Sequence, residues 1–208
     1  MRYAPSFLSS VGETRIQLSS NCYTDAYPLL STLTVRKLPV DLRAPTLALA
    51  TAILSADLCG SIFDFSGVRL GDDFAEAIRI VLGREVSVLN VDGLGRGLAT
   101  AEQDVVAGRA GRPLPVAPAS DGTPIARIEW SGDFVDRDTA SSAGFFFGGI
   151  QTNALYFADE ARVSVAMALL FGRERCRDIA IAADAQTRKS LAPVADALRV
   201  VGITLNMS

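Results

Sequence analysis

Four aspartates occupy positions where the sequence predicts the ends of strands and the start of a helix. Asp64 lies inside a predicted strand, Asp72 and Asp73 begin the helix that follows, and Asp92 ends the next strand. Parallel strands bring their carboxyl ends to one edge of an open α/β sheet, where ligands bind. Carboxylate oxygens there would suit Mg²⁺ together with a phosphate. The simpler interpretation is local, with Asp72 or Asp73 capping its helix, Asp92 in a turn and no metal bound.

A glycine-rich loop follows the strand that ends at Asp92. Gly93, Gly95 and Gly97 alternate with Leu94 and Arg96, so backbone amides and one guanidinium are available to an anion. The spacing departs from a dinucleotide fingerprint because position 98 is Leu, and no Gly-Lys-Ser/Thr follows. We favour a turn between two halves. The alternative ligand site comprises Asp64, Asp72, Asp92, Gly93, Gly95 and Arg96.

Three consecutive aromatic residues, Phe145, Phe146 and Phe147, lie within a segment that runs from Gly144 to Gly149. The flanking glycines favour an apolar loop. Adjacent side chains point in different directions in any regular backbone, so three rings do not all face one core. Burial of one Phe side chain is worth roughly 1.5–3 kcal/mol. We therefore predict that at least one of these rings lies in an interface with another subunit or a partner protein.

The composition excludes several classes of protein. The 208 residues contain no histidine, which removes Ser-His-Asp and Cys-His nucleophile systems and every His-containing metal site. Twenty basic and 23 acidic residues leave a net charge of −3, so nucleic acid and anionic membranes are not expected partners. The first residues lack the apolar core of a signal peptide and no apolar stretch is long enough to span a membrane, so neither feature is expected. Three widely spaced cysteines fit a cytoplasmic protein.

The hydrophobic periodicity predicts an α/β fold with largely parallel or mixed sheets. Residues 1–97 form a first α/β half, residues 98–124 a Gly/Pro-rich connection with a short helix near 100–107, and residues 125–208 a second α/β half. Strands are expected near residues 15–19, 32–35, 61–65, 86–91, 125–130, 178–182 and 203–207. Helices are expected from about Asp41 to Leu58, from Asp72 to Gly83, from 153 to 171 and from 190 to 201.

The second half resembles a diverged copy of the first. Residues 49–65 and 166–182 both have the pattern helix, cysteine, strand, and Cys59 and Cys176 are 117 positions apart. Residues 74–83 and 194–202 match as well, as do the ends 89–91 and 205–207. Internal duplication would give two similar strand–helix–strand–helix–strand halves. Cys59 and Cys176 would then occupy equivalent places, each just ahead of a strand.

Residues 32–91 resemble the STAS-type fold of anti-sigma factor antagonists and related regulators. The resemblance rests on the order strand, helix, strand 61–65 with Asp64 inside it, helix from Gly71, and strand 86–91. It implies a protein that acts through contacts with other proteins. The phosphorylated serine of that family is replaced by Asp72 and Asp73 at the helix start, so phosphorylation by the family mechanism is not implied.

The sequence thus favours a non-catalytic regulatory or complex-forming subunit that acts through protein–protein contacts, as a homo-oligomer or with a protein partner. The alternative is a small enzyme or binding protein for a phosphorylated metabolite, with its site at the carboxyl ends of the strands. The sequence contains no complete catalytic motif, so whether the protein is an enzyme stays open. No cofactor is expected.

Overall fold

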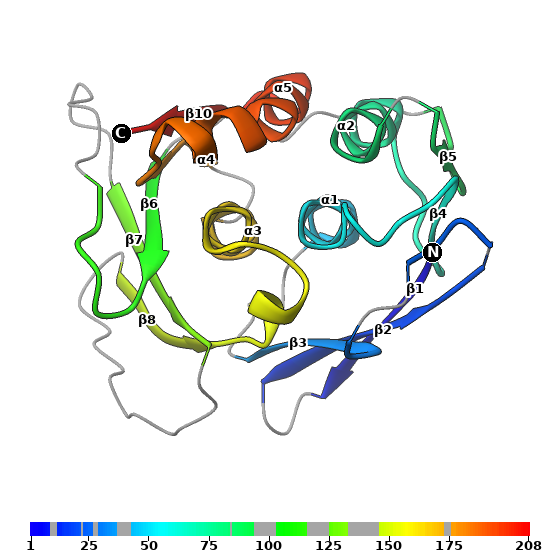
Figure 1. The fold of residues 1–208 in the computed structure, drawn as a ribbon, viewed down its shortest axis with the longest axis horizontal. Coiled ribbons are helices and arrows are strands. Elements are labelled where there is room, and N and C mark those ends of the chain that lie inside the picture. The colour runs from blue at the N-terminus through cyan, green and yellow to red at the C-terminus, as the bar shows by residue number, and fades with distance from the viewer. Residues whose placement is uncertain are drawn as a thin grey trace.

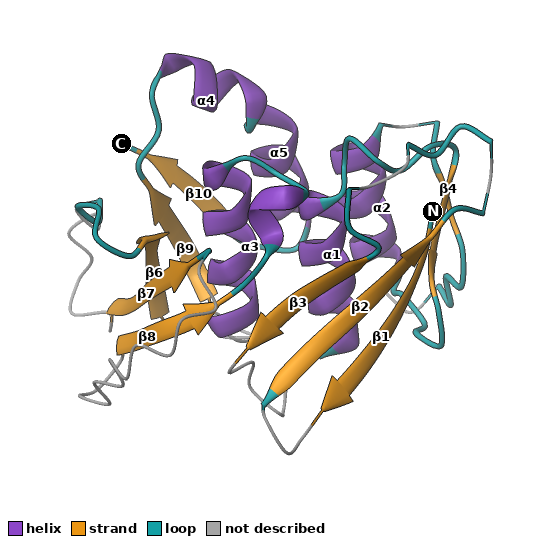
Figure 2. Cartoon of the chain, turned by 60° about the horizontal axis from the view of Figure 1, so that its bottom comes forward, coloured by secondary structure: helices purple, strands orange, loops and turns teal. Residues whose placement is uncertain are grey.

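A computed structural model shows two β-sheets that enclose a layer of helices (Figures 1 and 2). It describes residues 1–8, 12–21, 23–26, 29–36, 43–83, 85–93, 103–115, 125–132, 146–172 and 176–208. The fold class is the α/β class that the sequence predicts, with one mixed and one all-parallel sheet.

The first sheet has the strand order β3-β2-β1-β4-β5. Its strands are β1 (Arg2–Leu8), β2 (Glu13–Ser19), β3 (Thr32–Arg36), β4 (Ile62–Phe65) and β5 (Ser87–Val88). β1, β2 and β3 pair antiparallel, whereas β4 and β5 add in parallel. In β2, buried Ile16 and Leu18 alternate with exposed Arg15 and Gln17, because only one face of this part of the sheet is covered.

The second sheet has the order β10-β9-β6-β7-β8, and all its pairs are parallel. Its strands are β6 (Gln103–Arg109), β7 (Ile125–Ser131), β8 (Phe146–Gln151), β9 (Cys176–Ile181) and β10 (Thr204–Met207). The central strand β6 has the buried run Val105-Val106-Ala107, as expected of a strand inside a parallel sheet.

Two buried helices fill the space between the sheets. α1 (Ala44–Leu54) and α3 (Glu160–Gly172) pack side by side, and both are apolar all round over most of their length (Figure 1). The amphipathic helices α2 (Asp72–Leu82) and α5 (Ala192–Val200) pack against each other along one side of this layer. The short elements η2 (Ala154–Tyr156) and α4 (Ala185–Ser190) precede α3 and α5.

The two sheets are joined at β3 and the end of β8. Val35 and Thr152 form an antiparallel bridge. The carboxamide of Asn153 binds two backbone groups of β3: Oδ1 accepts the N–H of Thr34 at 2.7 Å, and Nδ2 donates to the carbonyl of Thr32 at 2.8 Å. The hydroxyl of Thr152 donates to the carbonyl of Thr34 at 2.9 Å. One polar turn therefore connects the second sheet to the edge of the first.

Three sequence predictions are wrong in detail. Residues 103–109, expected in a helix and a connection, form β6, because a short apolar run does not distinguish helix from strand by periodicity. The expected Phe loop is in fact strand β8 from Phe146 onward, paired with β7. Phe145 and the side chains of residues 146–149 lie outside the described residues. The strand expected over 86–91 is limited to Ser87–Val88. The strand β1 has no counterpart among the predicted strands.

The sheets share a strand order that bears on the predicted duplication. The orders β3-β2-β1-β4-β5 and β8-β7-β6-β9-β10 correspond, with α1 and α3 ahead of β4 and β9. Cys59 lies three residues before β4, and Cys176 is the first residue of β9. One strand differs, because β2 is antiparallel to β1 whereas β7 is parallel to β6. Internal duplication therefore stays a prediction.

Among the helices that the structure describes, none has both the length and the apolar character needed to cross a membrane.

Candidate functional site

A pocket of about 620 Å³ lies beside the carboxyl ends of β6 and β9. The end of β6 and the turn after it form one wall, and the start of α3 forms a second. The residues after β9 and helix α4 close the third side. The polar side chains used below are Arg109, Arg112, Glu160, Ser164, Asp184 and Thr187.

The topology explains why a pocket forms at this place. β6 leads along the chain to β7 on one side of it, whereas β9 leads through α4 and α5 to β10 on the other side. The strand order therefore reverses between β6 and β9, and in open parallel sheets this is where ligands bind. A Cβ at Gly108 in this wall would lie 2.9 Å from Cδ2 of Leu114 in the following turn, so a larger residue there would require the Leu114 side chain to move.

Two arginines in the pocket share one carboxylate. Nη1 of Arg109 lies 3.5 Å from Oε2 of Glu160, and Nε of Arg112 lies 3.3 Å from Oε1. Glu160 begins α3, where the helix dipole favours a negative charge. The side chains of all three are a third or more exposed, so each pair contributes at most about 1 kcal/mol. Both guanidinium groups therefore have donors left for a further anion.

The walls formed by α4 and α3 present a further carboxylate and a bonded hydroxyl group. Asp184 caps α4, accepting the backbone N–H of Thr187 at 2.8 Å. This hydrogen bond holds the pKa of Asp184 below its ordinary value. The hydroxyl of Ser164 accepts from Nε1 of Trp130 at 3.1 Å and donates to the carbonyl of Glu160 at 2.9 Å. Ser164 is thus held in place by two bonds, and neither of its partners among the described residues is a base that could activate it as a nucleophile.

The aspartates predicted from the sequence are not all brought together. Asp64 on β4 accepts from Nδ2 of Asn90 at 3.3 Å and lies 3.5 Å from Nε of Arg2. Asp72 lies at the start of α2, where a Cβ built on Gly93 would be 4.0 Å from its Oδ2. No group of three Asp, Glu or Cys side chains suited to a metal occurs in the described part of the chain.

The local interpretation of these aspartates is right in part. The N-cap of α2 is Gly71, with no side-chain cap bond, so the expected capping by Asp72 or Asp73 is wrong. Both carboxylates lie in the first turn, where they complement the helix dipole. Leu70 and Val91 form an isolated parallel bridge, and the N–H of Asp92 donates to the carbonyl of Leu70 at 3.0 Å, so the turn expected at Asp92 stays a prediction. Gly95 and Arg96 lie outside the described residues.

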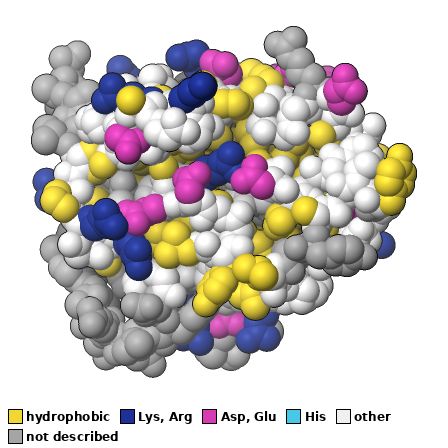
Figure 3. All heavy atoms as spheres, viewed as in Figure 1, with side chains coloured by type: hydrophobic (Ala, Val, Ile, Leu, Met, Phe, Trp, Pro, Cys, Tyr) yellow, Lys and Arg dark blue, Asp and Glu magenta, His cyan; other side chains and the backbone are white. Residues whose placement is uncertain are grey.

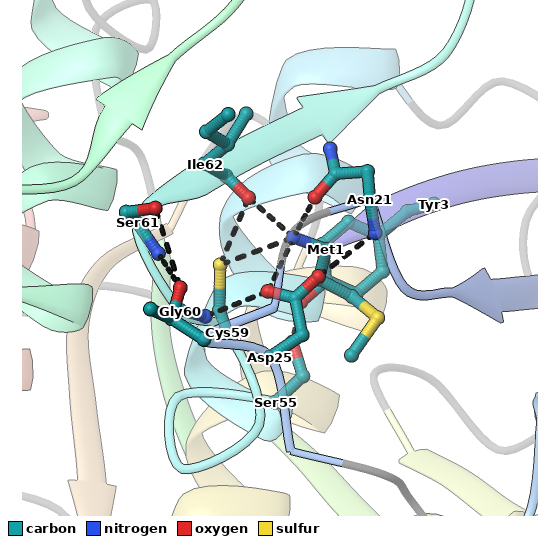
Figure 4. A network of polar contacts seen from close by, with 10 residues as sticks. Met1, Tyr3, Asn21, Asp25, Ser55, Cys59, Gly60, Ser61 and Ile62 are labelled. Carbon is teal, nitrogen blue, oxygen red and sulfur yellow. Dashed lines mark hydrogen bonds and ion pairs between the residues drawn. The ribbon is translucent and has the colours of Figure 1, made fainter.

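A second polar cluster surrounds the amino group of Met1 at the start of β1 (Figure 4). This ammonium lies 2.8 Å from Oδ1 of Asp25 and 2.6 Å from Oδ1 of Asn21, and it donates to the carbonyl of Ile62. The Asp25 carboxylate also accepts the backbone N–H groups of Gly60 at 2.8 Å and Asn21 at 2.9 Å. The side chains of Met1 and Asp25 are almost completely buried, and the ammonium and the carboxylate are both well bonded.

A thiol and a phenol complete this cluster. Sγ of Cys59 lies 3.9 Å from the Met1 amino group and 3.4 Å from the carbonyl of Ile62. The hydroxyls of Tyr3 and Ser55 are 2.7 Å apart. Burial raises the pKa of the Cys59 thiol and that of Tyr3, so both groups are neutral at pH 7. The cluster is therefore structural, since a reactive cysteine needs a lowered pKa.

The fold and pocket thus define an α/β protein with a polar site at the ends of parallel strands. Comparisons with protein-family models, with curated proteins and with solved structures found no significant match.

The pocket residues are not among those predicted from the sequence. The strand-end rule predicts a site in the first half, whereas the pocket belongs to the second. Arg109, Glu160 and Asp184 are widely separated in the sequence, and only the strand order brings them together. The one available signal was Asp184 followed by Thr187, a pattern typical of a helix N-terminus.

Proposed function

We propose that this protein binds a small anionic metabolite in the pocket between β6 and β9, and that it acts by binding rather than by catalysis. The observation that supports this proposal is the pair Arg109 and Arg112, which shares the single carboxylate of Glu160 at the carboxyl ends of two parallel strands. The function corresponds to the phosphorylated-metabolite alternative, but the site differs from the one expected.

The charges of the pocket favour a ligand with an anionic group at one end and hydrogen-bond donors at the other. The arginines would bind a phosphate or carboxylate, for which the guanidinium geometry is suited. Asp184, on the opposite side, would accept from a hydroxyl or amine of the same ligand. Basic and acidic side chains lie next to one another on the face shown in Figure 3, so selectivity must come from the arrangement of charges rather than from a single-sign patch.

Thermal unfolding with a panel of small anions tests this proposal. The panel contains inorganic phosphate, glycerol 3-phosphate and citrate, with glycerol as the neutral control. A ligand at 100 times its Kd adds about 2.7 kcal/mol to the free energy of unfolding. Arg112→Gln should abolish the stabilisation, whereas Arg199→Gln, at an exposed ion pair on α5, should leave it unchanged. Equal stabilisation of the wild type and Arg112→Gln by a given anion would contradict the proposed site.

A second candidate function is the complex-forming subunit. β8 is the edge strand of the all-parallel sheet and contains Phe146 and Phe147. An edge strand presents backbone groups that can pair with another chain. The proposed assembly is a homo-oligomer or a complex with another protein, and it does not involve nucleic acid. The free thiols of Cys59 and Cys176 support a cytoplasmic location.

Native mass measurement tests this second proposal. Replacement of Phe145, Phe146 and Phe147 by Ser should shift the mass of the wild-type assembly toward the monomer and leave the far-UV spectrum largely intact. An unchanged mass would remove the support that the Phe segment provides.

A further inference from the structure

Asp104, the second residue of β6, is the most unusual polar residue in the described structure. It is 1% exposed, and neither carboxylate oxygen has a hydrogen-bond partner. An ionised carboxylate in such a place costs many kcal/mol unless a donor or a cation compensates it. Within the described part of the chain, nothing does so.

The β-bulge in β9 places a second carboxylate beside Asp104. Gln103 pairs with Cys176, so a regular register would place Arg177 opposite Asp104. The register shift instead pairs Asp104 with Asp178. Partners on neighbouring strands lie on the same face of a sheet, so both carboxylates are on one face. The other neighbour of Asp104 is Ile125 on β7, which has no polar group to offer.

The register shift places a second carboxylate, rather than the Arg177 side chain, opposite Asp104. Like charges directly opposite each other destabilise a sheet, whereas an Asp–Arg pair would stabilise it. Bulges of this kind re-aim side chains next to functional sites. Both oxygens of the second carboxylate have partners: Oδ1 of Asp178 accepts from Nδ2 of Asn206 at 3.3 Å, and Oδ2 lies 3.1 Å from Nε of Arg177, so of the two carboxylates only Asp104 is left uncompensated by the described residues.

We propose that Asp104 and Asp178 bind a divalent cation on this face of the second sheet. Two carboxylates are the number that Mg²⁺ commonly takes from a protein, with water completing its shell. Oxygen-only ligands select Mg²⁺, Mn²⁺ or Ca²⁺ over softer metals. Neither aspartate lines the pocket between β6 and β9, so this site is independent of the proposed function.

Titration of the chelator-treated full chain with Mn²⁺ tests the proposal, with free Mn²⁺ followed by electron paramagnetic resonance. We expect one site per chain, and competition by Mg²⁺. Asp104→Asn and Asp178→Asn should each weaken Mn²⁺ binding by at least about tenfold. Asp196→Asn is the matched control, because this exposed carboxylate pairs with Arg199 on α5. Mn²⁺ should also raise the unfolding temperature of the wild type and of Asp196→Asn only.

Three results would overturn the proposal. The first is a wild-type chain that binds no Mn²⁺. The second is unchanged binding in both Asp104→Asn and Asp178→Asn. The third is an Asp104→Asn chain that is more stable than the wild type by the same amount with and without Mn²⁺. That result would mean that Asp104 is a buried charge that no cation compensates. If Asp104→Asn does not fold, Asp178→Asn decides, since the side chain of Asp178 is 14% exposed and tolerates an amide more easily.

Discussion

Two buried aspartates in this protein have opposite surroundings. The carboxylate of Asp25 accepts from the Met1 ammonium and from two backbone N–H groups, so its burial is compensated in full. Asp104 is equally buried, and no partner reaches it from the described residues. A satisfied buried charge is typical of structural roles, whereas an unsatisfied one calls for a ligand. The contrast separates the cluster around Met1 from the proposed cation site.

Replacement of Asp25 by Asn should be strongly destabilising. The amide retains an acceptor for one backbone N–H but leaves the buried ammonium of Met1 without a counter-charge. Removal of one partner of a buried ion pair costs about 3–5 kcal/mol. Urea denaturation of Asp25→Asn and of the exposed control Asp196→Asn measures the difference. A loss of less than about 0.5 kcal/mol, the range of ordinary surface substitutions, would contradict the structural role of this pair.

The buried ion pairs of Glu13 should make the stability of the folded state depend on pH in the acid range. Its side chain is 5% exposed, with Oε1 2.5 Å from Nε of Arg15 and Oε2 2.9 Å from Nε of Arg36. Burial raises the pKa of Glu13, but the hydrogen bonds from Arg36 and Arg15 outweigh it and hold the pKa below its ordinary value. Such a group stabilises the folded state above its unfolded pKa, near 4.3, and loses this contribution as pH falls through the folded pKa.

Denaturation of wild type and Glu13→Gln as a function of pH measures this contribution. The wild type should be the more stable chain at pH 6, and its advantage should shrink as pH falls below about 4.3. An advantage that is constant with pH would show that the ion pairs of Glu13 do not depend on its charge.

Secondary structure elements with strong patterns were predictable. Residues 15–19 alternate, and 72–83 have a clear helical face with charged residues opposite, so β2 and α2 lie where expected. β6 and β8 were missed because short apolar segments fit both loop and helix interpretations, and tertiary pairing decides between them. Buried central helices such as α1 are apolar on all sides, which the sequence indicates by composition rather than by periodicity.

The two classes of helix should respond differently to truncation. Leu49 on α1 is fully buried between the sheets, whereas Leu82 at the end of α2 is only partly buried. Leu49→Ala should cost about 2–5 kcal/mol of unfolding free energy, because the surroundings of a central helix cannot collapse into the cavity. Leu82→Ala should cost clearly less. Equal losses by chemical denaturation would contradict the placement of α1 in the core.

At the scale of the whole molecule, strand order determines the candidate site. The sequence predicts βα units in both halves, and the rule that ligands bind at the strand ends of parallel sheets names an edge of the sheet but not the strands concerned. The sequence does not show which strands are neighbours, so the reversal between β6 and β9 could not be found from it. The bulge that pairs Asp104 with Asp178 is likewise invisible without the register. Local patterns thus predicted elements, whereas both proposed sites depend on long-range pairing.

The junction between the sheets gives the last prediction. The carboxamide of Asn153 bonds to the edge strand β3 as a neighbouring strand would. It accepts from the N–H of Thr34 and donates to the carbonyl of Thr32. Asn153→Ala leaves both groups without this partner, at a cost of roughly 1–3 kcal/mol for each group that stays buried. The backbone amide of Thr34 should then exchange its hydrogen faster than in the wild type, while amides in β6 and β9 keep their protection.

Gln17→Ala is the control for this experiment, because it removes an exposed side-chain bond to Thr32 on the same pair of strands. It should leave the exchange of Thr34 unchanged. Faster exchange in both variants would mean that β3 opens whenever either side-chain bond is lost. Protection of Thr34 that survives Asn153→Ala would show that packing of α1 against α3 holds the sheets together without the polar turn.

Because that packing connects the two halves through their most buried helices, we expect global unfolding of Asn153→Ala to remain a single transition, with only the β3 edge loosened.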